Sequence, residues 1–318
     1  MTTRAAAPAL LSYRPWRGAL RGPSHGVWAI ARVSFLMLAR RKLFWAIYGF
    51  SAMIFLFFFY GQYLQFWIRS QLGEDDVRLG SGLVGIRIKP ADLLKLLQNA
   101  LHLDGTGYTY RNFFSFEGQI VIIVLALAGS ILIGNDFRFG SLPFYLSKPL
   151  HRWHYLLGKF LGVAIFVNLL TTLPASLLFV EYGMIDTWRY YLEHIDLLIG
   201  ICGYGAVLSI VLGLALLATA CWVRRTVPMI MVWTGLFLFA RIMADILVFR
   251  LGLHPRWRLI DLWNDMYLIG NWCLDMPHYT IRPRNQPEYW EAAVVLTLVS
   301  AACAIFLNRR IRAVEVVA

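Results

Sequence analysis

Six stretches of the chain are apolar over a length close to that needed to cross a lipid bilayer. Crossing a hydrocarbon core of about 30 Å takes about 20 apolar residues in a helix. None of the six alternates apolar and polar residues with a period of two, as the strands of a membrane barrel do. The pattern therefore predicts an all-α integral membrane protein with six transmembrane helices, at about 43–61, 119–135, 157–180, 197–222, 227–249 and 291–308.

A seventh stretch, 259–274, approaches the length of a span but carries several polar residues. Asp261, Asn264, Asp265 and Asn271 would each be costly to place in hydrocarbon. A span here would also move the basic C-terminal end to the opposite side of the membrane. We therefore predict that 259–274 does not cross the bilayer.

Several segments outside the predicted spans have patterns of their own. Residues 1–26 are rich in Arg, Ala, Pro and Gly and are expected to form a disordered basic N-terminus. Residues 27–40 are apolar nearly all round, which suits a helix in the membrane interface, and they begin a transmembrane domain at 27–318. Residues 91–103 predict an amphipathic helix that lies on the outer surface or against the bundle. Four tryptophans suit the interfacial belt: Trp257, Trp263, Trp272 and Trp290.

Composition and charge support the membrane interpretation and give it an orientation. Hydrophobic residues make up 59% of the chain and charged residues 15%, against about 25% charged in a typical soluble domain. Basic clusters adjoin span ends at 40–42, 224–225 and 309–312. Because Lys and Arg favour the cytoplasmic side, both termini are predicted to be cytoplasmic in a multi-pass protein of the cell (inner) membrane. This asymmetry supplies much of the net charge of +12 and suits anionic lipid, so no nucleic-acid partner is needed.

The sequence lacks the patterns of an ATP-binding, metal-binding or catalytic site. It contains no G-x-x-x-x-G-K-[ST] phosphate loop, and no soluble segment is long enough for an ATPase domain. The four cysteines, at 202, 221, 273 and 303, include no Cys-x-x-Cys pair. No set of nucleophile, base and acid stands out. We therefore expect no catalytic residue, metal or cofactor in this chain, and we expect that it is not an enzyme.

Two charged residues fall inside the fifth predicted span. Arg241 and Asp245 are separated by four positions, so they lie on one face of a helix and can pair. Charges within a span are costly, and they often mark a functional site. One interpretation is a self-neutralised structural pair near the outer end of the span. The other is that the two residues face a polar translocation path or a partner subunit.

The loop between the second and third predicted spans, 136–152, combines charged and apolar residues. Its charged residues include Asp136, Arg138 and Arg152. A free loop would expose the apolar side chains to water, whereas a protein interface uses apolar anchors within a charged rim. We predict that a short helix around 140–146, ended by Pro149, docks on another protein. The alternative is that the aromatic residues lie in the lipid headgroup layer. The apolar residues are Phe137, Phe139, Leu142, Phe144, Tyr145 and Leu146.

This loop resembles the first cytoplasmic loop of ABC-2 type transporter permeases, particularly the ABC-2 family group of separate membrane subunits. In those proteins an acid and a Gly-Ser/Thr-Leu step precede a Ser-x-Pro, an Arg, and a Leu-Gly-Lys that opens the next helix. The helix at 27–40 is similar to their elbow helix. The C-terminal residues 309–316 are similar to the ends of multi-copper-enzyme-maturation-type permeases. The matching loop residues are Asp136, Gly140-Ser141-Leu142, Ser147-Lys148-Pro149, Arg152 and Leu157-Gly158-Lys159.

The resemblance implies a permease subunit of an ATP-binding cassette exporter. It implies a separate ATPase subunit that carries the ATP, and a second permease copy, either identical or different. The loop 136–152 would couple ATPase closure to the second and third spans. Two other classes stay open at this stage: a membrane scaffold or assembly factor without transport, and a membrane-embedded enzyme that modifies lipid.

Overall fold

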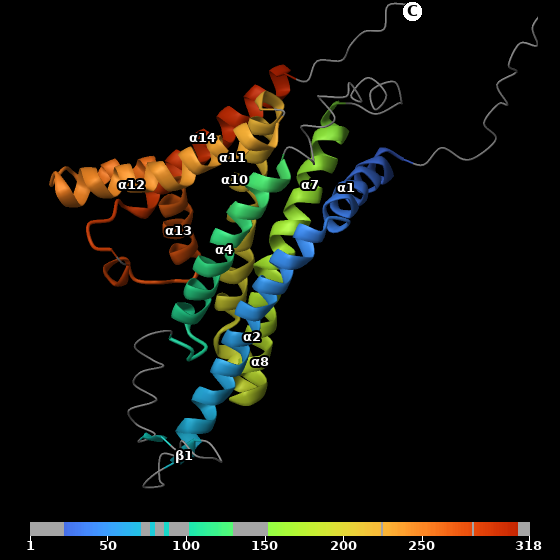
Figure 1. The fold of residues 1–318 in the computed structure, drawn as a ribbon. Coiled ribbons are helices and arrows are strands. Elements are labelled where there is room, and N and C mark those ends of the chain that lie inside the picture. The colour runs from blue at the N-terminus through green and yellow to red at the C-terminus, as the bar shows by residue number, and fades with distance from the viewer. Residues whose placement is uncertain are drawn as a thin grey trace, which may run out of the picture.

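The computed structural model is an elongated bundle of helices (Figure 1). It describes residues 22–70, 77–79, 86–88, 102–129, 152–223, 225–281 and 283–310. The long helices are α1 (Pro23–Ala39), α2 (Lys42–Ser70), α4 (Gly107–Gly129), α7 (Arg152–Leu170), α8 (Thr172–Ile185), α10 (Ile195–Trp222) and α14 (Tyr289–Arg310). A further long rod consists of α11 (Thr226–Thr234), the π-helical turn η2 (Gly235–Phe239), α12 (Ala240–Asp245) and the π-helical turn η3 (Ile246–Arg250). The shorter elements are α9 (Arg189–Glu193), η4 (Pro255–Ile260), α13 (Leu262–Cys273), η5 (His278–Thr280) and an antiparallel pair of strands, β1 (Val77–Leu79) and β2 (Ile86–Ile88).

The prediction of six membrane-spanning helices is confirmed. Within the described residues, six helices are long and apolar enough to cross a bilayer: Lys42–Trp67, Gly107–Leu127, Trp153–Ile185, Ile195–Trp222, Thr226–Arg250 and Tyr289–Arg310. The third comprises α7 and α8, separated by a break at Thr171. Pro174 lacks a backbone N–H donor, and this accounts for the position of the break a few residues before it. α13 has only 12 residues, or about 18 Å of helix, which confirms that 259–274 does not span.

The second span begins at Gly107, well before the predicted start at 119. Polar side chains interrupt the apolar pattern in the first half of α4, so hydropathy alone placed the boundary too late. The structure turns the most costly of these side chains inward. Glu117 is fully buried, and Ser51 Oγ of α2 donates a hydrogen bond to Glu117 Oε2 at 2.7 Å. The predicted end of this span at 135 lies outside the described residues.

Helix α1 packs along α7 through small residues. A Cβ atom on Gly158 would lie 2.7 Å from the Cβ of Ile30, and a Cβ on Gly162 would lie 2.9 Å from the Cβ of Ser34. α1 buries one face in this contact, including Ala31 at 0% exposure and Ser34 at 1%. It begins at Pro23 rather than at 27, and 1–21 lie outside the described residues. The Leu157-Gly158-Lys159 step lies within α7 rather than at its start, and its glycine serves this close approach.

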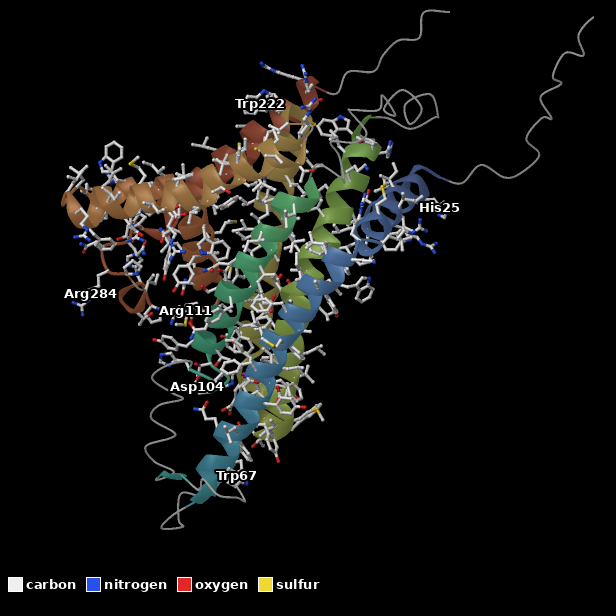
Figure 2. All side chains as sticks on the ribbon, viewed as in Figure 1. His25, Trp67, Asp104, Arg111, Trp222 and Arg284 are labelled. Atoms are coloured by element: carbon white, nitrogen blue, oxygen red, sulfur yellow. The ribbon has the colours of Figure 1, made fainter. Side chains whose placement is uncertain are left out.

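The two described ends of the chain lie toward the same end of the bundle (Figure 1), as the predicted topology requires. Figure 2 shows His25 and Trp222 toward one end of the bundle, and Trp67 and Asp104 toward the other. Both described ends of the chain, the start of α1 and the end of α14, lie toward the first of these ends (Figure 1). This agrees with an even number of crossings. The side of the membrane that each end faces stays a prediction from the basic clusters.

The segment between α12 and α14 folds back against the bundle instead of lying free. α13 packs on α10, where a Cβ on Gly270 would lie 2.2 Å from the ring of Tyr204. α13 also packs on α4, where a Cβ on Gly118 would lie 2.2 Å from the ring of Trp263. Trp263 is therefore only 7% exposed. The prediction that it belongs to the interfacial belt is wrong. Trp257, Trp272 and Trp290 are exposed, as residues of an interfacial belt would be.

Replacing Gly200 by Ala is expected to lower the melting temperature of the purified protein. A Cβ at this position in α10 would lie 2.2 Å from the backbone oxygen of Cys273, so α13 would have to move. Such overpacking costs about 1–3 kcal/mol. Gly203→Ala, one turn further along α10, is the matched control because its Cβ would lie 3.4 Å from Cys273 Sγ, an ordinary contact. Equal melting temperatures for the two variants would contradict the close packing of α10 and α13.

Candidate functional site

The polar residues of the 250–275 segment come together with those of α12 and α4. The chain leaves η3 at Arg250 and turns at Gly252, whose φ of +65° suits glycine. The His254 side chain then accepts a hydrogen bond from the backbone N–H of Arg256 and caps η4. Asp261 Oδ1 accepts hydrogen bonds from the backbone N–H groups of Trp263 and Asn264 at 3.1 and 3.3 Å and caps α13. These two caps place the short helices η4 and α13 beside α12 (Figure 1).

Asp245 forms its ion pair with Arg258, not with Arg241 as predicted. The distance between Arg258 Nη2 and Asp245 Oδ1 is 3.2 Å. Arg258 is 4% exposed and also lies over the ring of Phe249, 5.1 Å from its centroid. A buried guanidinium needs a partner far more than an exposed one does. Arg241 is exposed, so the tertiary contact from η4 replaces the local pairing along the helix.

A cavity of about 140 Å³ lies at this junction. α4 contributes Ser115 and Gln119 to its wall, and α12 contributes Arg241. The remaining wall comes from the segment that follows η3. In that part of the wall are Arg258, Asp261, Trp263, Asn264, Tyr267 and Pro283.

The buried ionisable groups beside the cavity have pKa values that are shifted in different ways. Burial, together with the charge of the nearby Asp261, raises the pKa of Asp265 to about 9, so the Asp265 carboxyl is neutral at pH 7. Burial also raises the pKa of Asp261, whereas its hydrogen bonds from Asn264 and Trp263 and the charge of Arg241 oppose that shift. For Arg258, burial lowers the pKa and Asp245 opposes the change. The site thus combines the guanidinium groups of Arg241 and Arg258, the Asp261 side chain that caps α13, and the neutral carboxyl of Asp265.

A second ion pair fixes the same segment to the start of α14. Arg256 Nε donates to Glu291 Oε1 at 2.6 Å, and Glu291 Oε2 accepts from the backbone N–H of Glu288. Asn264 Nδ2 donates to Gln286 Oε1 at 2.9 Å. Within the described residues, no group of three or more His, Cys, Asp or Glu side chains is arranged to hold a metal ion. The arrangement can hold an anion or a proton.

The predicted coupling loop can be located only by its ends. Residues 130–151 lie outside the described part of the chain, and with them Asp136, Arg138, Gly140, Ser141, Leu142, Phe144, Leu146 and Pro149. Arg152 is the first residue of α7. The loop therefore joins α4 to α7, and α7 carries α1 along one side.

Sequence reasoning missed a small polar cluster inside the bundle. Asn168 Nδ2 donates to Ser209 Oγ at 2.7 Å, and Thr172 Oγ1 donates to Asn168 Oδ1 at 2.6 Å. The cluster joins the break between α7 and α8 to α10. A Cβ on Gly205 would lie 1.7 Å from Thr172 Oγ1. The presence of Asn168 within an apolar stretch is the signal from which this cluster could have been found.

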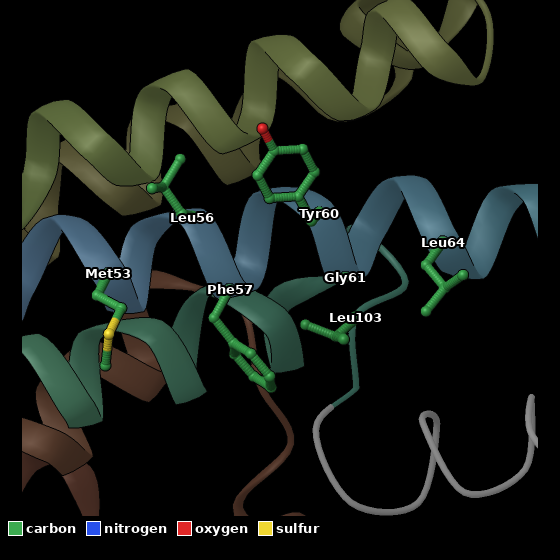
Figure 3. A pocket seen from close by; sticks show the side chains of 7 residues that line it. All are labelled: Met53, Leu56, Phe57, Tyr60, Gly61, Leu64 and Leu103. Carbon is green, nitrogen blue, oxygen red and sulfur yellow. The ribbon is translucent and has the colours of Figure 1, made fainter. Parts of the chain in front are cut away.

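Another cavity, of about 420 Å³, runs along α2 (Figure 3). Its wall is formed by α2 residues together with Leu103, whose side chain lies against Gly61 (Figure 3). Leu103 is fully buried and fixes the start of the 102–106 turn on α2. The α2 residues in the wall are Met53, Leu56, Phe57, Tyr60, Gly61 and Leu64. A wall this apolar suits a lipid chain more than a polar ligand.

Six long apolar helices, with charges gathered against one of them, define a multi-pass membrane protein. The model of the ABC-2 family transporter proteins matches residues 28–254. The chain therefore belongs to this family and is a membrane-spanning permease subunit of a transporter. A comparison with curated proteins found no match. The family match runs from α1 to the end of the fifth span, so η4, α13 and α14 lie beyond it.

Proposed function

We propose that this chain is the permease subunit of an ATP-driven exporter in the cell (inner) membrane. The match to the ABC-2 family over residues 28–254 carries this proposal. The family generally partners with an ATPase subunit of the ATP-binding cassette type, and the chain has no phosphate loop of its own. A separate ATPase subunit therefore binds and hydrolyses the ATP. A second permease copy, identical or different, completes the membrane part.

The loop 136–152 is the proposed contact with the ATPase. Its ends continue into α4 and α7, so movement of the loop would pull on the second and third spans together. Because α1 packs on α7 through Gly158 and Gly162, α1 would move with them. This motion would reshape a path at the interface between the two permease copies. Both termini and this loop face the cytoplasm in this proposal, in keeping with the basic clusters at 40–42, 224–225 and 309–312.

Purification of the tagged full chain from its source membrane tests this function. We expect an ABC-type ATPase to elute with it, and we expect the reconstituted complex to hydrolyse ATP. A scaffold would bring down other membrane proteins without ATP turnover. A lipid-modifying enzyme would change the lipids of the vesicles without any ATPase present. Either of those results, in place of an associated ATPase, would contradict the proposal.

A further inference from the structure

The cavity of about 140 Å³ between α4, α12 and the 255–283 segment has more cationic donors than its own carboxylates satisfy. Arg258 is 4% exposed, and only one of its three nitrogens is paired. Its Nε and Nη1 atoms are buried without a hydrogen-bond partner among the residues that the structure describes. A buried donor left in this way is costly, and such groups ordinarily have a partner.

Arg241 of α12 also lines the cavity, and its N–H donors also lack a partner among the described residues. It lies in the fifth span, yet it is exposed and makes no hydrogen bond or ion pair with any described residue. An arginine without an ion pair within a membrane span is costly and is a sign of a functional contact. Its neighbours Ile242 and Ile246 are exposed apolar residues of the same helix, as lipid-facing residues are.

The nearby acids leave N–H donors of both arginines without a hydrogen bond among the described residues. Asp245 is engaged with Arg258 Nη2. Asp261 lies within electrostatic reach of both arginines, but its Oδ1 caps α13, and it forms no ion pair with either guanidinium group. Asp265 has neither oxygen hydrogen-bonded, and burial raises its pKa to about 9, which keeps it uncharged at pH 7. The groups left over are guanidinium donors and neutral side chains such as Ser115 and Gln119.

These features define the ligand by its charge, size and geometry. Guanidinium groups present parallel N–H donors that match the oxygens of a phosphate group. A cavity of about 140 Å³ holds several water molecules or one group of phosphate size, since a water takes about 30 Å³. We propose that this cavity binds a phosphate group, with Arg241 and Arg258 as its ligands. The proposal does not depend on transport, and Arg258 lies beyond the residues matched by the family.

The phosphate can belong to a phospholipid headgroup or to a soluble phosphate, and binding measurements on the full chain in lipid-depleted micelles distinguish them. The probes are inorganic phosphate, short-chain phosphatidylglycerol, and a diacylglycerol with the same chains and no phosphate. We expect phosphatidylglycerol, inorganic phosphate or both to bind and to raise the melting temperature. The diacylglycerol should do neither. Binding of phosphatidylglycerol alone identifies a lipid headgroup, and binding of inorganic phosphate as well identifies a site for soluble phosphate.

Variants of α12 and η3 test the assignment of the ligands. Arg241→Gln is expected to weaken phosphate binding by about tenfold or more, because a charge-assisted contact is lost. Arg250→Gln is the matched control, since Arg250 is an exposed arginine of the same rod that does not line the cavity. Asp245→Asn should tighten binding, because it frees Arg258 Nη2 for the ligand. A purely structural role for Asp245 would give weaker binding instead.

Several results would overturn the proposal. They are equal binding of the phosphate-free diacylglycerol, unchanged binding in Arg241→Gln, weaker binding in Asp245→Asn, or no binding of either phosphate probe. Arg258→Gln also removes the partner of Asp245, so its phosphate binding is interpreted only after the variant is shown to fold. In that case, loss of binding is expected.

Discussion

Replacing Leu142 and Leu146 together by Asp is expected to abolish co-purification of the ATPase and to uncouple its activity. Both leucines lie in the predicted docking loop, where apolar anchors within a charged rim would contact a groove on the partner. Each such anchor typically contributes about 2 kcal/mol or more, so losing two weakens binding by several hundredfold. The measurement is the amount of ATPase retained on the tagged permease, together with the ATP hydrolysis of the reconstituted complex.

The control for this prediction makes the same chemical change in the loop that follows the fifth span. Leu251 and Leu253 are exposed by 63% and 40% in the loop after η3. Their double replacement by Asp should leave the ATPase bound. Unchanged co-purification of the Leu142→Asp/Leu146→Asp variant, with normal membrane insertion, would favour the alternative that the loop lies in the lipid headgroup layer. It would also remove the main support for the assignment of the loop.

Neutralising Asp245 by the change to Asn is expected to destabilise the protein by about 2–3 kcal/mol. The change leaves the charge of Arg258 buried without its partner. Breaking a fully buried pair costs about 3–5 kcal/mol, and the expected loss is smaller because Asp245 is 43% exposed and partly screened. Unfolding of the purified protein in micelles, followed by a denaturant or by heat, measures the loss.

The second substitution in a double variant identifies the partner of Asp245. Adding Arg258→Gln should recover much of the lost stability, since the stranded charge is then removed. Adding Arg241→Gln should not, because Arg241 makes no ion pair with Asp245. The local pairing predicted from the sequence requires the reverse result. If the Asp245→Asn/Arg258→Gln protein accumulates normally but has lost transport, the pair also serves the translocation path.

The membrane class and the number of spans could be predicted from the sequence because both depend on local properties. A helix crosses a bilayer when about 20 consecutive residues are apolar, and this can be counted along the chain. The rejection of 259–274 rested on the same reasoning, since its four polar residues would not be solvated in hydrocarbon. The loop 136–152 could be singled out because its motif is contiguous, and the family that this motif resembles is the one to which the chain belongs. The role of the loop stays a prediction.

The start of the second span and the contacts of α1 could not be predicted in this way. Gly107 begins a helix whose first half is polar, and that half is tolerated because Glu117 finds Ser51 on α2. Gly158 looked like part of a loop motif, whereas its function in the structure is to let α1 approach α7. Both features depend on a neighbour far away in the sequence.

By itself, the sequence determined that six apolar helices cross the membrane, that basic residues gather at one set of helix ends, and that charges occur within the fifth span. Only the tertiary structure decided which charges meet. The caps at His254 and Asp261 turn the chain back and bring Arg258 against Asp245, so Arg241 lies beside a cavity without an ion pair to any described residue. Spacing along a helix cannot anticipate this result, because a buried charge pairs with the group that folding brings within reach, and that group came from a separate segment of the chain.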